Sequence, residues 1–300
     1  MPALLSSFIQ PFLEYLAYQK RYSPHTITSY QTDLIGFFDF ISVNYGELAL
    51  LDIKPAFVRS WLASLKEKNI ASKSINRKIS SLKSFFKYQL RNKTIDVSPM
   101  ATMVSLKVSK RLPSFIEQKD TSDFFKHFEF ADTWQGKTDQ LLLKIFYQTG
   151  VRLSELINLK TNQVDNSNSN IKVIGKGNKE RMIPINNELI SDISFYIKEK
   201  KKYIGNPDEQ YILVNDKGKK LYPKYVYNAV KSYLNKITTN SKKSPHVLRH
   251  TFATHLVNNG ADINAVKELL GHSSLAATQV YTHNSIEKLK DIHKKAHPKS

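Results

Sequence analysis

The chain has 300 residues, a length that allows two domains of ordinary size, each able to bury its own core. Lysine and arginine number 45 against 26 acidic residues, and the net charge of +19 indicates a polyanionic partner, with a nonspecific basic surface as the alternative. The absence of cysteine excludes disulfides and thiolate chemistry. No segment resembles a signal peptide or a membrane span, so we expect a cytoplasmic protein with no membrane partner.

Four helices are predicted in the N-terminal part of the chain. Apolar residues recur at helical spacing from Leu4 to Tyr22. Ser23 followed by Pro24 is an N-cap and first-turn signal, and Pro55 opens the third helix in the same way. The fourth helix is predicted over Ser72–Asn92. These elements predict an all-helical N-terminal domain.

The fourth helix has two contrasting sides. Its buried stripe is predicted to contain Ile75, Ile79, Leu82 and Phe86. The other side carries long cations and short hydroxyls at intervals of three and four residues: Lys73, Arg77, Ser80, Ser84 and Lys87. Such a face suits the phosphates along a DNA groove, although an ordinary solvated face has the same pattern.

The stretch from Asp96 to Pro113 loses clear periodicity, contains prolines and carries several cations. It is typical of a connection between domains. We place a helical domain at residues 1–106, a linker at 107–113 and a second domain at 114–300.

The second domain is predicted to be mostly helical with a small antiparallel sheet. Residues 171–174 and 181–185 alternate as two strands about Gly175-Lys176-Gly177-Asn178, which predicts a hairpin with Lys176 at its tip. Gly150 is a helix stop, and Arg152 follows it at once. Around these, helices are predicted over Ile116–Phe128, Thr138–Thr149, Glu188–Lys202 and Lys224–Lys236, with a short strand over Tyr211–Val214.

The segment that begins at Pro245 is the richest in chemically active groups. On a helix opened by that proline, His246 and Arg249 stand one turn apart, where an imidazole and a guanidinium suit a phosphate oxygen. An apolar stripe opposite them, with Leu248, Phe252 and Leu256, predicts that both face outward into a site. Further on, Ala261–Leu270 is predicted to be a helix that Gly271 ends, so His272 lies at the turn, and Leu275–Tyr281 is predicted to be another.

Metal and nucleotide chemistry are not expected. His246 and His250 have the spacing of a zinc-protease helix, but Val247 stands where that motif needs glutamate. Gly175-Lys176-Gly177 lacks the spacing of a nucleotide-binding loop, and no acidic cluster suits magnesium. We therefore expect no metal and no cofactor.

Several motifs occur in one order and together resemble those of tyrosine recombinases, most closely the Xer group. They are Thr149–Leu156 (TGVRLSEL), Val173–Arg181 (VIGKGNKER), His246–Leu256 (HVLRHTFATHL), Leu270-Gly271-His272 and Tyr281-Thr282-His283. Ser23–Leu34 and Ser74–Arg77 similarly resemble the helical, SAM-like core-binding domain of these enzymes. The resemblance spans both halves of the chain.

The resemblance implies a role for each matching residue. Tyr281 would be the nucleophile, although a phenol with a pKa of about 10 needs help to attack phosphorus. Arg152 and Arg249 would stabilise the transition-state charge on the phosphate. By resemblance, Lys176 would protonate the leaving 5′-hydroxyl, and His246 would help to deprotonate the tyrosine. His272 would bind a phosphate oxygen, and Glu155 would orient its neighbours. Lys179 and Arg181 would contact DNA.

The implied activity is site-specific recombination, in which DNA strands are cut and rejoined through a 3′-phosphotyrosyl link without ATP. The expected setting is resolution of chromosome dimers at cell division, and the alternative is an integrase of a phage or mobile element. A type IB topoisomerase and a catalytically silent DNA-binding protein are more distant alternatives. Expected partners are a double-stranded recombination site, a homo- or hetero-tetramer with a partner recombinase, and an activating DNA translocase. A stripe of Ile286, Leu289 and Ile292 is expected to dock on a neighbouring subunit.

Overall fold

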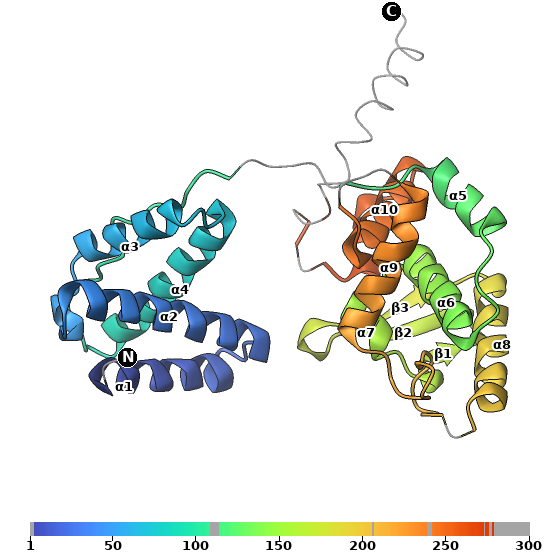
Figure 1. Ribbon diagram of the computed structural model, residues 1–300, viewed down its shortest axis with the longest axis horizontal. Helices are drawn as coiled ribbons and strands as arrows, with labels where there is room; N and C mark the ends of the chain where they lie inside the picture. The colour runs from blue at the N-terminus through green and yellow to red at the C-terminus, as the bar shows by residue number, and fades with distance from the viewer. Residues whose placement is uncertain are drawn as a thin grey trace, which may run out of the picture. The chain divides into compact units, whose positions relative to one another are not determined.

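The computed structural model describes residues 3–108, 114–205, 207–238, 242–272, 274–275 and 278. The chain divides into two compact units, Met1–Lys110 and Arg111–Ser300 (Figure 1). Within the described residues, no helix combines the length and the apolar character needed to cross a membrane.

The N-terminal unit is built from helices alone. They are α1 (Ala3–Glu14), a π-helical turn (Tyr15–Gln19), α2 (Pro24–Tyr45), a 3-10 turn (Leu50–Asp52), α3 (Pro55–Glu67) and α4 (Ser72–Arg91). The predicted start of α2 is confirmed, because Ser23 Oγ accepts a hydrogen bond from the backbone N–H of Thr26 and Pro24 occupies the first turn. The first helix ends at Glu14 rather than near Tyr22, since the chain continues there as the π-helical turn.

The core of this unit is aromatic. Fully buried rings from α1, α2 and α4 pack mostly edge to face, namely Phe12, Phe37, Phe38, Phe85 and Phe86. The predicted buried stripe of α4 is confirmed, with Ile75, Ile79 and Leu82 at 1% exposure or less. The opposite side of α4 therefore faces away from the core, and Lys73, Arg77 and Ser80 are exposed there.

The interpretation of Asp96–Pro113 as a connection is wrong for its first part. Met100 and Met103 are 2% and 6% exposed and belong to the N-terminal core. The amide side chain of Asn76 also bonds both the backbone N–H and the carbonyl of Leu106, at 2.7 and 2.9 Å. Irregular chain can thus be held in place by side chains without any periodic pattern. The narrower linker at 107–113 stays a prediction.

The C-terminal unit combines helices with one small sheet. Its helices are α5 (Gln118–His127), α6 (Trp134–Thr149), α7 (Leu153–Ile157), α8 (Asn187–Tyr203), α9 (Pro223–Ile237), α10 (Pro245–Asn258) and α11 (Ile263–Leu270). Its strands are β1 (Val164–Asp165), β2 (Asn170–Ile174) and β3 (Glu180–Pro184), with 3-10 turns at Thr161–Gln163 and Lys176–Asn178. Figure 1 shows α6 near the centre of the unit, in contact with α8, α9 and α10. Its residues Leu142, Ile145 and Phe146 are fully buried.

The predicted hairpin is confirmed: β2 and β3 pair antiparallel, and β1 joins the other edge of β2. The two-residue strand β1 was not predicted, because so short a segment has no alternation to detect. The predicted strand Tyr211–Val214 is wrong. Only single bridges form there, between Lys160 and Tyr211 and between Val214 and Lys220.

Candidate active site

The end of α6 brings a backbone carbonyl into the candidate site. Gly150 has a φ of +58°, the left-handed conformation that ends a helix, and its N–H bonds the carbonyl of Phe146. A Cβ atom at this position would lie 2.3 Å from Cδ1 of Phe252. Glycine is therefore required both by the backbone conformation and by the close approach of α10.

Arg152 comes directly after this turn and begins α7. Its backbone N–H and its Nη1 both donate to the carboxylate of Glu155, each at 2.8 Å. Its Nη2 donates to the carbonyl of Gly271 at 2.9 Å. The side chain remains 31% exposed. The arginine is therefore oriented by two protein partners and still reaches solvent.

Glu155 is the carboxylate on which two arginines converge. Besides Arg152, it receives Arg181 in a two-pronged pair, Nη1 to Oε1 at 2.9 Å and Nη2 to Oε2 at 2.8 Å. Burial raises the pKa of Glu155, but the hydrogen bonds from Arg181 and from the Arg152 backbone outweigh burial and lower the pKa to about 2. Glu155 is thus ionised at neutral pH, and the predicted orienting role fits its contacts.

Helix α10 supplies Arg249, which does not face outward as predicted. Its side chain is buried at 5% exposure, and its guanidinium donates to the carbonyls of Gly150 and Leu270. The helical period correctly placed Arg249 on the side of α10 opposite the apolar stripe. It could not show that the ends of α6 and α11 close over that side.

His246 lies one turn before Arg249 and is exposed. Partial desolvation of the imidazole by the groups around it and the positive charges of Arg249 and Arg152 lower the pKa of His246. A neutral imidazole can accept a proton at pH 7. Val151, Arg152, Tyr227, His246 and Arg249 line a pocket of about 160 Å³, which we term the arginine pocket.

His272 follows the left-handed Gly271 that ends α11, as predicted. Its Nδ1 lies 2.9 Å from Oγ1 of Thr278. Burial and the charges of Arg249 and Arg152 lower the pKa of His272 to about 4. His272 is therefore a neutral hydrogen-bonding group at pH 7 and adds no positive charge to that of the arginines.

Two residues of α10 to which no chemistry was assigned from the sequence, Thr251 and His255, hold this helix in place. Thr251 Oγ1 accepts the backbone N–H of Ile116 at 3.0 Å, and His255 Nε2 lies 2.8 Å from the carbonyl of the same residue. His255 Nδ1 also lies 3.2 Å from the hydroxyl of Tyr147 on α6. No local sequence signal predicts these contacts, because their partners lie more than a hundred residues away in the chain.

Arg181 departs from its predicted role in DNA contact. Its side chain is only 12% exposed, and its donors are directed to Glu155 and to the carbonyl of Leu269. The signal was present in the alternation of β3, since Arg181 has the same parity as the buried Ile183. Met182, of the other parity, is exposed.

Other predicted positions differ in how far the structure describes them. Lys176 lies in the 3-10 turn at the hairpin tip, and Lys179 is exposed just beyond it. On α4 of the N-terminal unit, Arg77 is 45% exposed although it pairs with the buried carboxylate of Asp33. Ser84 is partly buried. Tyr281 and the apolar stripe after it lie outside the described residues.

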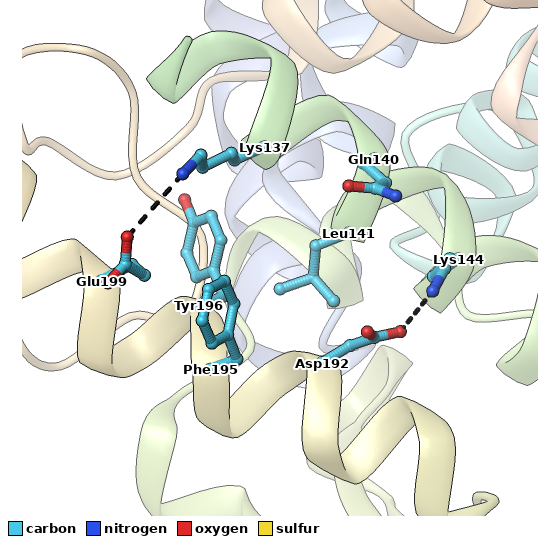
Figure 2. Close-up of a pocket in the computed structure, with 8 residues that line it drawn as sticks. All are labelled: Lys137, Gln140, Leu141, Lys144, Asp192, Phe195, Tyr196 and Glu199. Atoms are coloured by element: carbon cyan, nitrogen blue, oxygen red, sulfur yellow. Dashed lines mark hydrogen bonds and ion pairs between the residues drawn. The ribbon is translucent and has the colours of Figure 1, made fainter. Parts of the chain in front are cut away.

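A second pocket of the C-terminal unit has a different character. This α6–α8 pocket is lined by Leu141 and the exposed ring of Phe195, with an ion pair at each side (Figure 2). Lys144 Nζ lies 2.6 Å from the carboxylate of Asp192, and Lys137 Nζ lies 3.7 Å from that of Glu199. Each of its two lysines therefore has a carboxylate of α8 beside it.

Comparison with known proteins gives family matches for both halves of the chain. The model of the phage integrase family matches residues 115–288, and the model of the phage integrase N-terminal SAM-like domain matches residues 9–93. Tyrosine recombinase XerC of Chlorobaculum parvum is 35% identical, with 97% of this chain and 94% of that protein covered. XerC of Oceanobacillus iheyensis is 36% identical, with 99% and 97% covered.

Solved structures share the fold. The XerH site-specific recombinase bound to palindromic difH substrate, a post-cleavage complex, has a TM-score of 0.75 at 22% identity and covers 95% of this chain and 83% of its own. The Tn1549 transposon integrase in complex with transposon right end DNA has a TM-score of 0.73 at 20% identity, with 94% and 99% covered. At these identities the likeness concerns architecture.

Proposed function

This chain belongs to the phage integrase family of tyrosine recombinases, and we propose that it cuts and rejoins DNA at specific sites through a 3′-phosphotyrosyl intermediate. One observation of the site carries the proposal. Arg152 at the start of α7 donates to the carbonyl of Gly271, and Arg249 on α10 donates to the carbonyl of Leu270. These two acceptors are consecutive residues immediately before His272. Two guanidiniums and an imidazole are thereby gathered at one helix end, as recognition of a phosphate requires.

The charge of the site supports a phosphodiester substrate. Two guanidiniums, those of Arg152 and Arg181, pair with one ionised carboxylate, that of Glu155, so these three groups sum to +1. The carbonyls that hold Arg249 are neutral, so they orient the guanidinium without cancelling its charge. Such an arrangement stabilises negative charge that develops on phosphorus oxygens in the transition state.

In the proposed mechanism, Tyr281 attacks phosphorus while His246 assists removal of the phenolic proton. Lys176 gives a proton to the leaving 5′-hydroxyl, and His272 donates a hydrogen bond to a phosphate oxygen. The direction of the shift in the pKa of His246, below its ordinary value, supports this role, because a neutral imidazole can accept a proton. The covalent link conserves the energy of the phosphodiester, so rejoining needs no ATP.

The biological setting is proposed from the same family membership. Full-length similarity to XerC proteins favours resolution of chromosome dimers at cell division, in the cytoplasm, over integration of a mobile element. The face of α4 with Lys73, Arg77, Ser80 and Ser84 would contact the duplex, with Lys179 of the hairpin, and its exposed cations support this. A tetramer on DNA, with the same or a second recombinase, and activation by a translocase complete the proposal.

A nicked duplex tests the proposed chemistry, because the nick lets the cleaved strand diffuse away and traps the covalent adduct. The duplex would carry a site selected for binding to this protein. Wild type and the control Tyr222→Phe, which alters a half-exposed tyrosine, should form an adduct that survives detergent. Tyr281→Phe should bind the duplex equally and form none. An adduct in Tyr281→Phe would refute this nucleophile.

A further inference from the structure

Arg181 joins three segments of the C-terminal unit that are far apart in sequence. It lies on β3, next to the hairpin tip. Its Nη1 and Nη2 grip the two oxygens of Glu155 on α7, and its Nε donates to the carbonyl of Leu269 near the end of α11 at 2.7 Å. One side chain thus connects the hairpin, the helix begun by Arg152 and the helix end that precedes His272.

Gly271 leaves room for this side chain, and Gly175 leaves room for the carboxylate that it binds. A Cβ atom at Gly271 would lie 3.2 Å from Cδ and from Nη1 of Arg181. A Cβ atom at Gly175 would lie 3.3 Å from Oε1 of Glu155 and 3.6 Å from Nη1 of Arg181. These glycines immediately precede His272 and Lys176. The arginine therefore lies beside the backbone that immediately precedes His272 and Lys176.

A direct contact with DNA does not account for this geometry. Three of the guanidinium N–H groups already donate to protein oxygens, and the side chain is 12% exposed. The two-pronged pair with Glu155 needs the planar fork of arginine, which a lysine cannot reproduce. The neighbouring Lys179 is exposed and is the hairpin cation that can reach a phosphate.

We propose that Arg181 is a positioning residue that holds the β2–β3 hairpin against Glu155 and the end of α11, and so determines where Lys176 stands relative to Arg152 and His272. This inference rests on the proposed function, in which Lys176 is the general acid. A group that transfers a proton must lie within hydrogen-bond reach of its target, and a misplacement of about 1 Å can slow a reaction about 10²-fold.

The test compares two leaving groups at saturating concentrations of nicked duplex. One duplex carries the natural oxygen at the scissile bond, and the other carries a 5′-bridging sulfur, which leaves without being protonated. Arg181→Lys keeps the charge but loses the fork, and it should form adduct about 10²-fold more slowly on oxygen. On sulfur the defect should shrink at least about tenfold, as it should for Lys176→Ala.

Binding measurements separate positioning from phosphate contact. Arg181→Lys and Arg181→Gln should bind the duplex within about twofold of wild type, with an unchanged dependence of affinity on salt. The control Lys179→Gln should weaken binding and lower the salt slope by about one. Thermal unfolding checks that the variants are folded. If Arg181→Gln is not folded, the conclusion rests on Arg181→Lys.

Each outcome decides the matter. An equal defect of Arg181→Lys on both duplexes, or a lowered salt slope, would overturn the positioning role while Lys176→Ala is still rescued by sulfur. A failure of sulfur to rescue Lys176→Ala would instead refute the proposed general acid, and the inference would fall with it. If wild type forms no adduct at all, the proposed function itself is wrong.

Discussion

Two pockets of the C-terminal unit contain cations, Lys144 and Arg249, whose partners differ in charge. In the α6–α8 pocket, Lys144 is bound by the carboxylate of Asp192, so the charges cancel locally (Figure 2). In the arginine pocket, Arg249 donates to the carbonyls of Gly150 and Leu270, which orient it and are themselves neutral. A carboxylate partner places a negative charge beside the cation, whereas a carbonyl partner orients the cation and adds no charge.

Loss of a carbonyl-held arginine should have the largest effect. Arg249→Lys retains the charge without the fork and Arg249→Ala removes both, so each should slow adduct formation, the alanine variant by about 10²–10³-fold. The matched control Lys144→Ala, from the α6–α8 pocket, should react at the wild-type rate. The measurement is the rate of covalent adduct formation on a nicked duplex at saturation. Comparable losses of rate in Arg249→Ala and Lys144→Ala would show that the two cations do not differ in their importance for the reaction.

The charge of Glu155 should affect stability strongly, because this carboxylate holds two of the arginines. Its pKa falls from an ordinary 4.5 to about 2 in the folded state. The corresponding stabilisation is about 3 kcal/mol; it is complete above about pH 4.5 and is lost as the pH falls toward 2. The difference in unfolding free energy between wild type and Glu155→Gln should therefore shrink by about this amount between pH 5 and pH 2.

Urea unfolding can be followed in the C-terminal unit by its own fluorescence. The chain has two tryptophans, Trp61 in the N-terminal unit and Trp134 on α6, so both proteins would be studied in a Trp61→Phe background. A difference between the two proteins that stays constant with pH would mean that Glu155 is not strongly acidic in the folded state.

The carboxylate-held lysine of the α6–α8 pocket should show the smallest effect. Lys144 and Asp192 have side chains 16% and 33% exposed, and ion pairs near the surface contribute about 0.2–1 kcal/mol. A double-mutant cycle with Lys144→Gln and Asp192→Asn, measured by urea unfolding, should give a coupling energy within that interval. A coupling of several kcal/mol would show that this pair organises the unit as strongly as Glu155 does.

Features could be predicted from the sequence where the residues that form them lie close together along the chain. The cap at Ser23, the buried stripe of α4 and the β2–β3 hairpin depend on neighbouring residues, and all three are confirmed. The outward position of Arg249 was wrong and the burial of Arg181 was not anticipated, because their carbonyl partners come from helix ends elsewhere in the chain. Family motifs predicted roles for these residues without indicating what orients them.

The contact between Gly150 and Phe252 has a consequence for genetics. Any side chain at position 150 would strain a φ of +58° and collide with the ring of Phe252, and it would displace the carbonyl that receives Arg249. A screen for loss of recombination would therefore recover position 150 among the active-site alleles, although glycine has no reactive group. An intragenic suppressor that shortens Phe252 would relieve the collision but not the backbone strain, so such revertants would regain only part of the activity.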